Sequence, residues 1–420
     1  MQIPFWPPFQ GIRNIKFGLE RVIKLLERLD NPHHKLPPTI HFAGTNGKGS
    51  TLNFLHQLLK SNNFKVHCYT SPHLIEFNER IILANEQITD DFLNVCLKEC
   101  QEKSEIHPKI PITFFEGITV AAFLAFSKVK ADFLLLETGM GGRLDATNVL
   151  DKVLTSIITP ISLDHTEFLG DSIEQVTPEK AGIIKQDCQV IIGKQDSRSL
   201  KILKELAADK NSKTIIFNED FKIEKHQEYF NYVTKDQTLK IPNPSMIGSH
   251  QIDNLAVAVT AFKEITNIEA TNYDQSKIWP ARLQKMSIPT TNNELYIDGS
   301  HNMEGAKTVL EFLKSKKATK RIVIYSTLQD KDHQKFLELI AKEIDELIIT
   351  IIPGEPKSQD PKIIQATAND LNISSTINIK PKIISLLESG NQQQTVLITG
   401  SLYSAGFYLD QILSKSSNNQ

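Results

Sequence analysis

The sequence predicts an α/β protein with two domains, each built around a mainly parallel sheet. Short apolar segments alternate with longer segments whose apolar residues recur at helical spacing, as in parallel sheets with crossover helices. After Trp279 a polar stretch interrupts this alternation, which restarts near Leu295. We therefore expect a first domain over residues 1–285 and a smaller α/β domain over residues 286–420.

The expected elements follow in chain order. Buried strands of the first domain are predicted at short apolar runs: Thr39–Ala43, Lys65–Tyr69, Phe133–Glu137, Val153–Thr159 and Val190–Gly193. Helical spacing predicts helices at Ser50–Ser61, Thr119–Lys128 and Asp253–Glu264. Short β-rich pieces over Phe221–Ile241 indicate a small antiparallel elaboration. Strands of the second domain are expected at Leu295–Ile297, Arg321–Tyr325, Glu346–Ile351 and Thr395–Thr399.

Composition narrows the functional classes. The chain has 420 residues and a formal net charge of -2, so no overall basic field favours nucleic acid or an anionic membrane. Its apolar runs are shorter than the roughly 20 residues that a membrane helix requires. The four cysteines have no metal-binding spacing and read as reduced thiols of a cytoplasmic protein. We expect a monomer that acts on small molecules.

A candidate phosphate loop follows the first predicted strand. Gly44, Thr45, Asn46, Gly47, Lys48, Gly49 and Ser50 connect that strand to a helix. Such a turn directs backbone N–H groups and the positive end of a helix dipole at an anion, and Lys48 would reach the phosphates. Phe42 stands where the strict Walker pattern has its first glycine, so an ordinary glycine-rich turn is the alternative. The strand, the lysine and the hydroxyls of Ser50 and Thr51 favour phosphate binding.

Three further side chains are metal-site candidates. Glu137 ends a predicted strand at the edge that would carry the phosphate loop, which suits an Mg²⁺ ligand. His165 should reach the same edge, although on its own it is more typical of a hydrogen-bonded loop histidine. Lys180 lies near the start of a predicted helix and on its own is more typical of a solvated lysine. If it is buried, its amine would lose its charge readily and could react with carbon dioxide.

Taken together, the motifs resemble the folylpolyglutamate synthase and dihydrofolate synthase family of the Mur ligase superfamily. They occur in the family's order and cover nearly the whole chain: Gly44-Thr-Asn-Gly-Lys-Gly-Ser50, Ser71-Pro-His-Leu74, Glu137-Thr-Gly-Met-Gly-Gly-Arg-Leu-Asp-Ala-Thr-Asn148, Leu163-Asp-His165, Glu179-Lys-Ala-Gly182, His250-Gln-Ile-Asp-Asn254, Asp298-Gly-Ser-His-Asn302, Asp330-Lys-Asp332 and Thr399-Gly-Ser-Leu-Tyr403. The string Gly141–Asn148 is the most specific of these.

The resemblance implies a P-loop ATPase domain of the Mur ligase central-domain type and a Rossmann-like C-terminal glutamate-ligase domain that closes over the nucleotide. It implies ATP and Mg²⁺, with two ions. One ion would be held by Thr70, Glu137 and His165, where Thr70 replaces the serine of many relatives. Lys180 matches a family lysine that is carbamylated and holds the second ion. For Lys180 and His165, the resemblance therefore replaces the solvated-lysine and loop-histidine interpretations by metal binding.

The same resemblance assigns nucleotide and folate contacts. Asn254 would contact adenine, Arg282 would reach the phosphates, and Asp298 and His301 would complete the nucleotide site. Ala281 stands where the family usually has glycine, so it would restrict the linker if that glycine has a positive φ. The pterin-bearing substrate is expected along Ile112, Thr113, Phe114 and Phe115 and along Leu144, Asp145 and Ala146, although Phe114 and Phe115 fit a core role equally well.

The implied reaction makes a carboxylate electrophilic. Its oxygen would attack the γ-phosphate of ATP, with Lys48 and Mg²⁺ compensating the charge, and the amine of glutamate would attack the resulting acyl phosphate. His301 or an acidic group would assist loss of the amine proton. Two acceptors fit the resemblance, a folate and dihydropteroate. The alternatives are a Mur-type peptidoglycan-precursor ligase, against which Gly141–Asn148 and Ser71–Leu74 speak, and a nucleotide-regulated switch, which would not need Glu137, His165 and Lys180.

Overall fold

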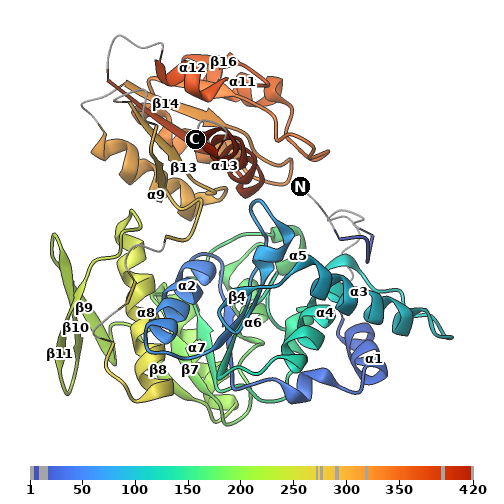
Figure 1. The fold of residues 1–420 in the computed structure, drawn as a ribbon. Coiled ribbons are helices and arrows are strands. Elements are labelled where there is room, and N and C mark those ends of the chain that lie inside the picture. Colours follow the sequence, from blue (N-terminus) through green and yellow to red (C-terminus); the bar gives the residue numbers. More distant parts are fainter. Residues whose placement is uncertain are drawn as a thin grey trace. The chain divides into compact units, whose positions relative to one another are not determined.

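The computed structural model describes residues 4–8, 18–270, 273–274, 278–288, 293–316, 320–388 and 393–417. The chain forms two compact units (Figure 1). Unit 1 comprises Met1–Pro244 and His250–Lys277, and unit 2 comprises Ser245–Ser249 and Ile278–Gln420. The predicted division at residues 285 and 286, with its assignment of functions, stays a prediction.

Unit 1 is organised around an eight-stranded sheet with the strand order β4-β3-β2-β5-β1-β6-β7-β8. Its strands are β1 (Thr39–Ala43), β2 (Val66–Tyr69), β3 (Ile81–Leu83), β4 (Glu86–Gln87), β5 (Phe133–Glu137), β6 (Thr155–Ile158), β7 (Gln189–Ile192) and β8 (Lys213–Ile216). The neighbouring strands β2, β5, β1, β6, β7 and β8 pair in parallel. Strands β3 and β4 are added next to β2 by antiparallel pairing. The predicted parallel sheet of the first domain is therefore confirmed.

Helices pack on both faces of this sheet (Figure 1). They are α1 (Glu20–Arg28), α2 (Lys48–Ser61), α3 (Asp90–Glu105), α4 (Phe114–Lys128), α5 (Thr166–Leu169), α6 (Ile173–Ala181), α7 (Ser197–Asp209) and α8 (Ser249–Thr266), with short 3-10 turns η2 (Pro32–Lys35), η3 (Phe77–Arg80) and η4 (Ala146–Val149). The side chains of Leu134 and Leu136 point to the face that α1, α3 and α4 cover. Helix α2 contacts β1, β2 and β5. Because both faces are covered, the central strands β1 and β5 are buried along their whole length and are rich in apolar residues.

The β-rich segment of unit 1 is a separate three-stranded antiparallel sheet, as predicted. It consists of β9 (Phe221–Lys225), β10 (Tyr229–Thr234) and β11 (Thr238–Pro242) in the order β11-β10-β9. The buried Tyr232 of β10 hydrogen-bonds through its hydroxyl to Thr260 Oγ1 of α8 at 3.0 Å. One face of this small sheet is therefore anchored on α8.

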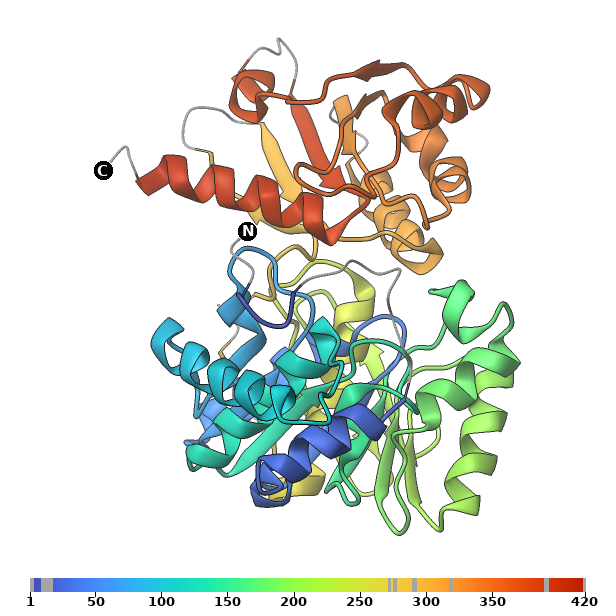
Figure 2. The same cartoon turned by 90° about the vertical axis from the view of Figure 1, so that its right-hand side faces the viewer.

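Unit 2 contains a six-stranded sheet with the order β12-β13-β17-β14-β15-β16. Its strands are β12 (Gln284–Met286), β13 (Glu294–Ile297), β14 (Lys320–Tyr325), β15 (Glu346–Ile349), β16 (Ser375–Ile377) and β17 (Gln394–Thr399). Its helices are α9 (Met303–Ser315), α10 (His333–Ile340), α11 (Pro361–Asp370), α12 (Ile383–Glu388) and α13 (Leu402–Ser417), with the 3-10 turn η5 (Ala341–Glu343). Only β12 is antiparallel to its neighbour among these strands. Figure 2 shows the helices around this sheet from the side.

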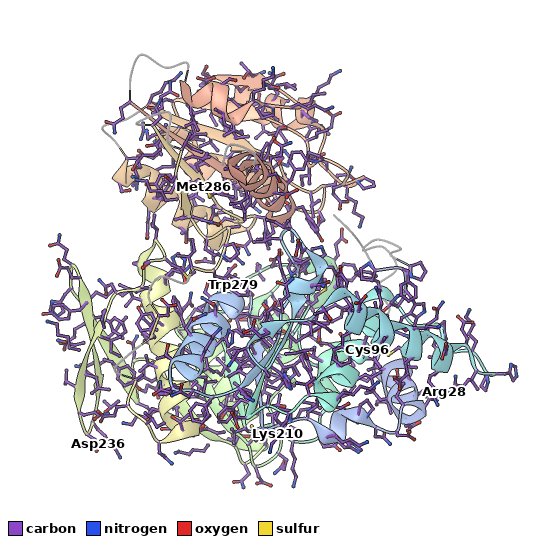
Figure 3. The ribbon with its side chains drawn as sticks, in the orientation of Figure 1. Arg28, Cys96, Lys210, Asp236, Trp279 and Met286 are labelled. Carbon is purple, nitrogen blue, oxygen red and sulfur yellow. The ribbon has the colours of Figure 1, made fainter. Side chains whose placement is uncertain are left out.

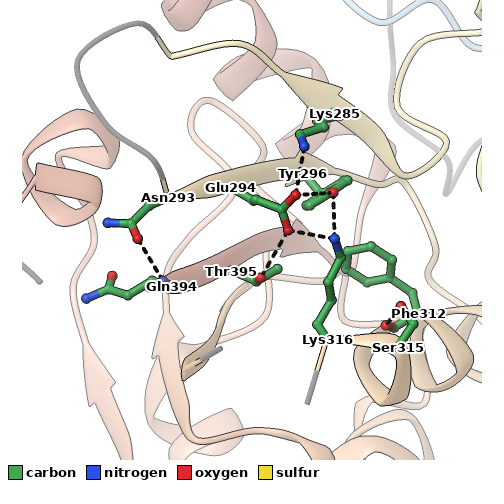
Figure 4. A network of polar contacts seen from close by, with 9 residues as sticks. All are labelled: Lys285, Asn293, Glu294, Tyr296, Phe312, Ser315, Lys316, Gln394 and Thr395. Carbon is green, nitrogen blue, oxygen red and sulfur yellow. Dashed lines mark hydrogen bonds and ion pairs between the residues drawn. The ribbon is translucent and has the colours of Figure 1, made fainter. Parts of the chain in front are cut away.

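An ion-pair network in unit 2 is centred on Glu294 (Figure 4). Glu294 at the start of β13 accepts hydrogen bonds from Lys285 Nζ at 2.7 Å and from Lys316 Nζ at 2.6 Å. Partial burial alone would raise the pKa of Glu294, but these lysines lower it to about 2. The network links β12, β13 and the end of α9, at the edge of the sheet opposite to the strand ends discussed below.

The cysteines of the chain are free and buried, as predicted, and Cys96 lies within the helical layer of unit 1 (Figure 3). In the part of the chain that the structure describes, no helix has the length and apolar character that crossing a membrane requires.

Candidate active site

The phosphate-loop residues lie where β1 ends and α2 begins. Gly47 is the N-cap of α2 and has φ 86°. Thr51 N donates a hydrogen bond to Gly47 O at 2.8 Å. Thr45 N and Asn46 N both donate to Pro160 O, which follows β6. The N–H groups at the start of α2 therefore form the part of the loop that is directed toward an anion.

Two glycines of the loop lie in conformations and places that a side chain could not share. Gly44 has φ 149°, and a Cβ there would come within 2.0 Å of Thr159 Oγ1. A Cβ at Gly47 would come within 2.5 Å of Asn254 Oδ1. Asn254, the residue predicted to contact adenine, therefore lies directly beside the loop. Asn254 on α8 is buried and donates through Nδ2 to Gln251 Oε1 at 3.1 Å.

Two lysines converge on the same carbonyl oxygen of this loop. Lys48 Nζ and Lys180 Nζ each lie 3.0 Å from Gly44 O, and Lys180 reaches it from α6. Lys180 is buried, and burial, followed by the charge of Lys48, lowers the pKa of its amine to about 7. The sequence alone suggested a solvated lysine near the start of a helix, whereas the fold buries Lys180 in the last turn of α6.

The candidate metal ligands come from neighbouring strands. Thr70 directly follows β2, Glu137 is the last residue of β5, and His165 lies in the segment that follows β6. The carboxyl ends of these parallel strands share one edge of the sheet with the phosphate loop. Glu137 Oε2 accepts a hydrogen bond from Ser71 N at 3.3 Å, which ties the ends of β2 and β5 together. His165 has a left-handed backbone with φ 52°.

The donor chemistry at this edge fits a hard cation. Glu137 and Thr70 are buried and supply a carboxylate and a hydroxyl oxygen, which Mg²⁺ prefers. The hydroxyls of Thr51 and Thr138 are also buried there, with no hydrogen-bond partner among the described residues. Across the described ranges, no group of three or more His, Cys, Asp and Glu side chains could hold a metal. The predicted ligands Thr70, Glu137 and His165 would not form such a group, because only Glu137 and His165 are of these residue types.

The segments predicted to hold the pterin-bearing substrate lie around the start of α4 and in the loop after β5. Thr113 caps α4 together with Glu116, and Phe114 and Phe115 form its first turn. Both rings are partly buried, and together with Ile112 they pack against the hydrophobic core of unit 1. Phe114 and Phe115 therefore make the contacts of core residues, and part of each side chain stays exposed.

Asp145 organises the loop that follows β5. Its Oδ2 accepts hydrogen bonds from Gly139 N and Met140 N, both at 2.9 Å, and its Oδ1 accepts from Thr147 Oγ1 at 2.6 Å. Burial raises the pKa of this carboxyl, while these donors lower it. Leu144 and Ala146 flank it, and Ala146 is buried. Sequence reasoning missed this use of Asp145, since nothing in the spacing shows which backbone groups it meets.

Unit 2 brings its own predicted residues together where β13 ends. Asp298 is buried; its Oδ2 accepts from Leu283 N at 3.0 Å and its Oδ1 from Ser300 N at 2.9 Å. His301 Nδ1 lies 3.0 Å from Gly299 O. A Cβ at Gly299 would lie 3.1 Å from Arg282 Nη1, so Arg282 belongs to the same cluster.

The backbone around Arg282 is unusual. Ala281 and Leu283 on either side have φ of 54° and 48°, in the left-handed region that favours glycine. We expected Ala281 to restrict the linker if its position has a positive φ. The structure shows a positive φ at this alanine.

Comparison with known proteins identifies two family models in the chain. The Mur ligase middle domain matches residues 42–262, and the glutamate ligase domain of Mur ligases matches residues 281–402. The dihydrofolate synthase/folylpolyglutamate synthase of Bacillus subtilis is 32% identical over 413 residues, covering 93% of each chain. The folylpolyglutamate synthase of Lacticaseibacillus casei is 29% identical and covers 92% of each chain.

Solved structures show the same likeness. The structure of FolC from Escherichia coli in complex with DHPP and ADP has a TM-score of 0.86 and 25% sequence identity, covering 97% of this chain and 95% of that chain. The folylpolyglutamate synthase of Thermotoga maritima has a TM-score of 0.78 at 28% identity, covering 94% and 93%. The likeness includes both units.

Proposed function

The chain belongs to the Mur ligase family, in its branch of folylpolyglutamate and dihydrofolate synthases, and we propose that it is an ATP-dependent ligase that joins L-glutamate to a folate. The observation that carries the proposal is one sheet edge where the phosphate loop, Lys48, the buried Lys180 and Glu137 lie together. A switch protein would need the loop but not the other groups. The relatives found are folate ligases, which disfavours a peptidoglycan-precursor substrate.

The residues of unit 1 suit the first step, in which a carboxylate oxygen attacks the γ-phosphate. The N–H groups at the start of α2 and the ammonium group of Lys48 are positioned to hold the phosphates and to compensate the charge that shifts during transfer. Thr70, Glu137 and His165 would hold Mg²⁺, which when bound neutralises charge on the transferring phosphoryl group. We further propose that Lys180 is carbamylated and contributes oxygen ligands to a second ion.

We assign the second half of the nucleotide site to unit 2. Arg282, Asp298 and His301 form one cluster there that would contact the nucleotide. Asp298 is already used by the backbone of Leu283 and Ser300, so its main role is to hold the cluster together. Arg282 would supply the charge, and His301 could accept the proton that the glutamate amine loses.

The folate would lie along Ile112–Phe115 and Leu144–Ala146. The partly exposed rings of Phe114 and Phe115 offer faces for an aromatic pterin. In this proposal Asp145 acts mainly by holding Gly139 and Met140 in place. Dihydropteroate is a second acceptor in the proposal, since the Bacillus subtilis relative is named for both activities.

We place the protein in the cytoplasm as a monomer. Its free, buried cysteines suit a reducing compartment. Sedimentation of the purified protein tests the monomer.

The function is tested by incorporation of labelled glutamate in the presence of ATP. Tetrahydrofolate and dihydropteroate are supplied as separate acceptors, and a UDP-linked peptide serves as the control. We expect incorporation with tetrahydrofolate and with dihydropteroate and none with the peptide. Incorporation with the peptide alone would refute the folate assignment. Activity with only one of the two pteroyl acceptors would define the chain as monofunctional.

A further inference from the structure

The loop between β2 and η3 has a fixed conformation in unit 1. The carboxylate of Glu79 accepts three backbone hydrogen bonds from this loop, from Leu74 N at 2.8 Å, Ile75 N at 3.0 Å and Glu76 N at 2.8 Å. Three bonds to one carboxylate hold the loop in one shape. The side chain of His73, just before these residues, is therefore held in place by a rigid backbone.

The partner of His73 fixes the position of the ring proton. Arg80 Nε donates to His73 Nδ1 at 2.8 Å, and both side chains are buried. A guanidinium N–H can only donate, so Nδ1 must be the acceptor and the proton of the neutral ring must be on Nε2. Burial, followed by the charge of Arg80, lowers the pKa of His73 to about 3, so the ring stays neutral near pH 7.

The remaining nitrogen of the ring is therefore a buried donor. His73 is only 7% exposed, and Nε2 has no hydrogen-bond partner among the described residues. A buried donor without an acceptor is destabilising and calls for an explanation. An acceptor that arrives with a ligand would remove that cost.

The position of His73 indicates which ligand this is. Its ring lies 5.4 Å from the ring of Phe77, which lies 6.3 Å from the ring of Phe114 in the proposed folate segment. On the other side, Ser71 of the same loop donates to Glu137, the proposed metal ligand. His73 thus lies on the loop that connects the proposed pterin end of the site with the end where the carboxylate reacts.

We propose that His73 Nε2–H donates a hydrogen bond to a carbonyl or carboxylate oxygen of the pteroyl substrate, which makes His73 a substrate-binding residue. This inference rests on the proposed ligase function and goes beyond it, because it assigns one donor and its tautomer. Arg80 acts through the ring as a positioning residue, since its N–H sets which nitrogen of His73 carries the proton.

A matched pair of substitutions separates the two nitrogens. In His73→Asn the amide oxygen can take the place of Nδ1 as acceptor for Arg80, but the donor at the Nε2 position is lost. In His73→Gln the amide N–H can take the place of Nε2, but the acceptor for Arg80 is lost. We expect His73→Asn to raise KM for tetrahydrofolate about tenfold, the effect of one lost hydrogen bond. His73→Gln should stay within about threefold of wild type, and KM for ATP should not change in either variant.

The outcomes distinguish this inference from the proposed function. A wild-type protein that incorporates glutamate into neither tetrahydrofolate nor dihydropteroate refutes the function itself. With an active wild type, a normal His73→Asn variant, or equal losses in both variants, would overturn the role of the Nε2 donor. Should His73→Asn fail to fold, as judged by thermal unfolding, His73→Gln decides alone: a KM for tetrahydrofolate near that of wild type supports the donor, and a large increase refutes it.

Discussion

Lys180 offers a direct test of the site chemistry. Carbamate formation requires a neutral amine, whose lone pair attacks the carbon of CO₂, so that an N–C bond forms and one proton is released. With a pKa of about 7, roughly three quarters of the Lys180 amines are neutral at pH 7.5. An unperturbed lysine near pKa 10.4 would be neutral in about one molecule in a thousand. Burial therefore raises the reactive fraction several hundredfold.

The assay combines spectroscopy with rescue of activity. Wild-type protein in ¹³CO₂-enriched buffer should show a carbamate ¹³C signal that Lys180→Ala lacks. The signal should weaken as the pH falls below 7, because the amine then takes up its proton. Lys180→Ala should be largely inactive, and acetate should restore part of the activity by supplying oxygen ligands, whereas methylamine should not.

Lys185 provides a matched control. Burial also lowers the pKa of its amine, but it donates to Asn148 O at 3.3 Å rather than to the phosphate loop. Lys185→Ala should keep the carbamate signal and most of the activity. Absence of the ¹³C signal in wild type, together with rescue of Lys180→Ala by methylamine alone, would show that Lys180 acts as a free amine.

The remaining predictions concern the loop, the linker and stability. Lys48→Ala should lower kcat at least about 100-fold with an unchanged unfolding temperature, because Lys48 compensates phosphate charge; comparable activity would refute the phosphate-loop assignment. Arg282→Ala should lower kcat about tenfold or more with little loss of stability, since it would act in the closed state; unfolding with normal activity per folded molecule would make it structural. Ala281→Val should destabilise the protein by about 2 kcal/mol, because a β-branched residue at φ 54° is strained, and Ala281→Gly should be nearly neutral in the same denaturant titration. Between pH 7 and about 10 the unfolded state binds more protons at Lys180 than the folded state. In CO₂-free, metal-free buffer, wild-type stability should therefore rise across this window, and Lys180→Met should lose that rise.

The sequence predicted the buried parallel strands well because their signal is local. The strands β1, β5 and β17 are buried at every position and each contains several apolar residues, as expected for strands covered on both faces. The edge strand β8 begins with an exposed lysine and was missed. Helix α3, with many charged residues, was missed for the same reason. Edge strands and solvated helices have weak patterns, since only part of their surface meets the core.

Site residues at strand ends were predictable, whereas their contacts were not. The position of Glu137 after an apolar run indicates an active edge in any parallel α/β sheet. The pairing of Arg80 with His73 depends on how the chain turns back through η3, and no sequence period encodes that turn. The backbone hydrogen bonds of Asp145 are equally a product of the fold.

The geometry at Gly44 gives a reason for a modified lysine at this site. The Nζ atoms of Lys48 and Lys180 both lie 3.0 Å from one carbonyl oxygen, so two full positive charges would repel each other across a short distance. Lys180 is buried, and burial, followed by the charge of Lys48, lowers its pKa to about 7. Loss of its proton removes the repulsion, and a carbamate would turn the remaining neutral group into an anion beside the cation of Lys48. The same step would leave Lys48 as the charge that faces the phosphates and add an oxygen ligand for a divalent ion. The burial of Lys180 and its place beside Lys48 are therefore two parts of one arrangement.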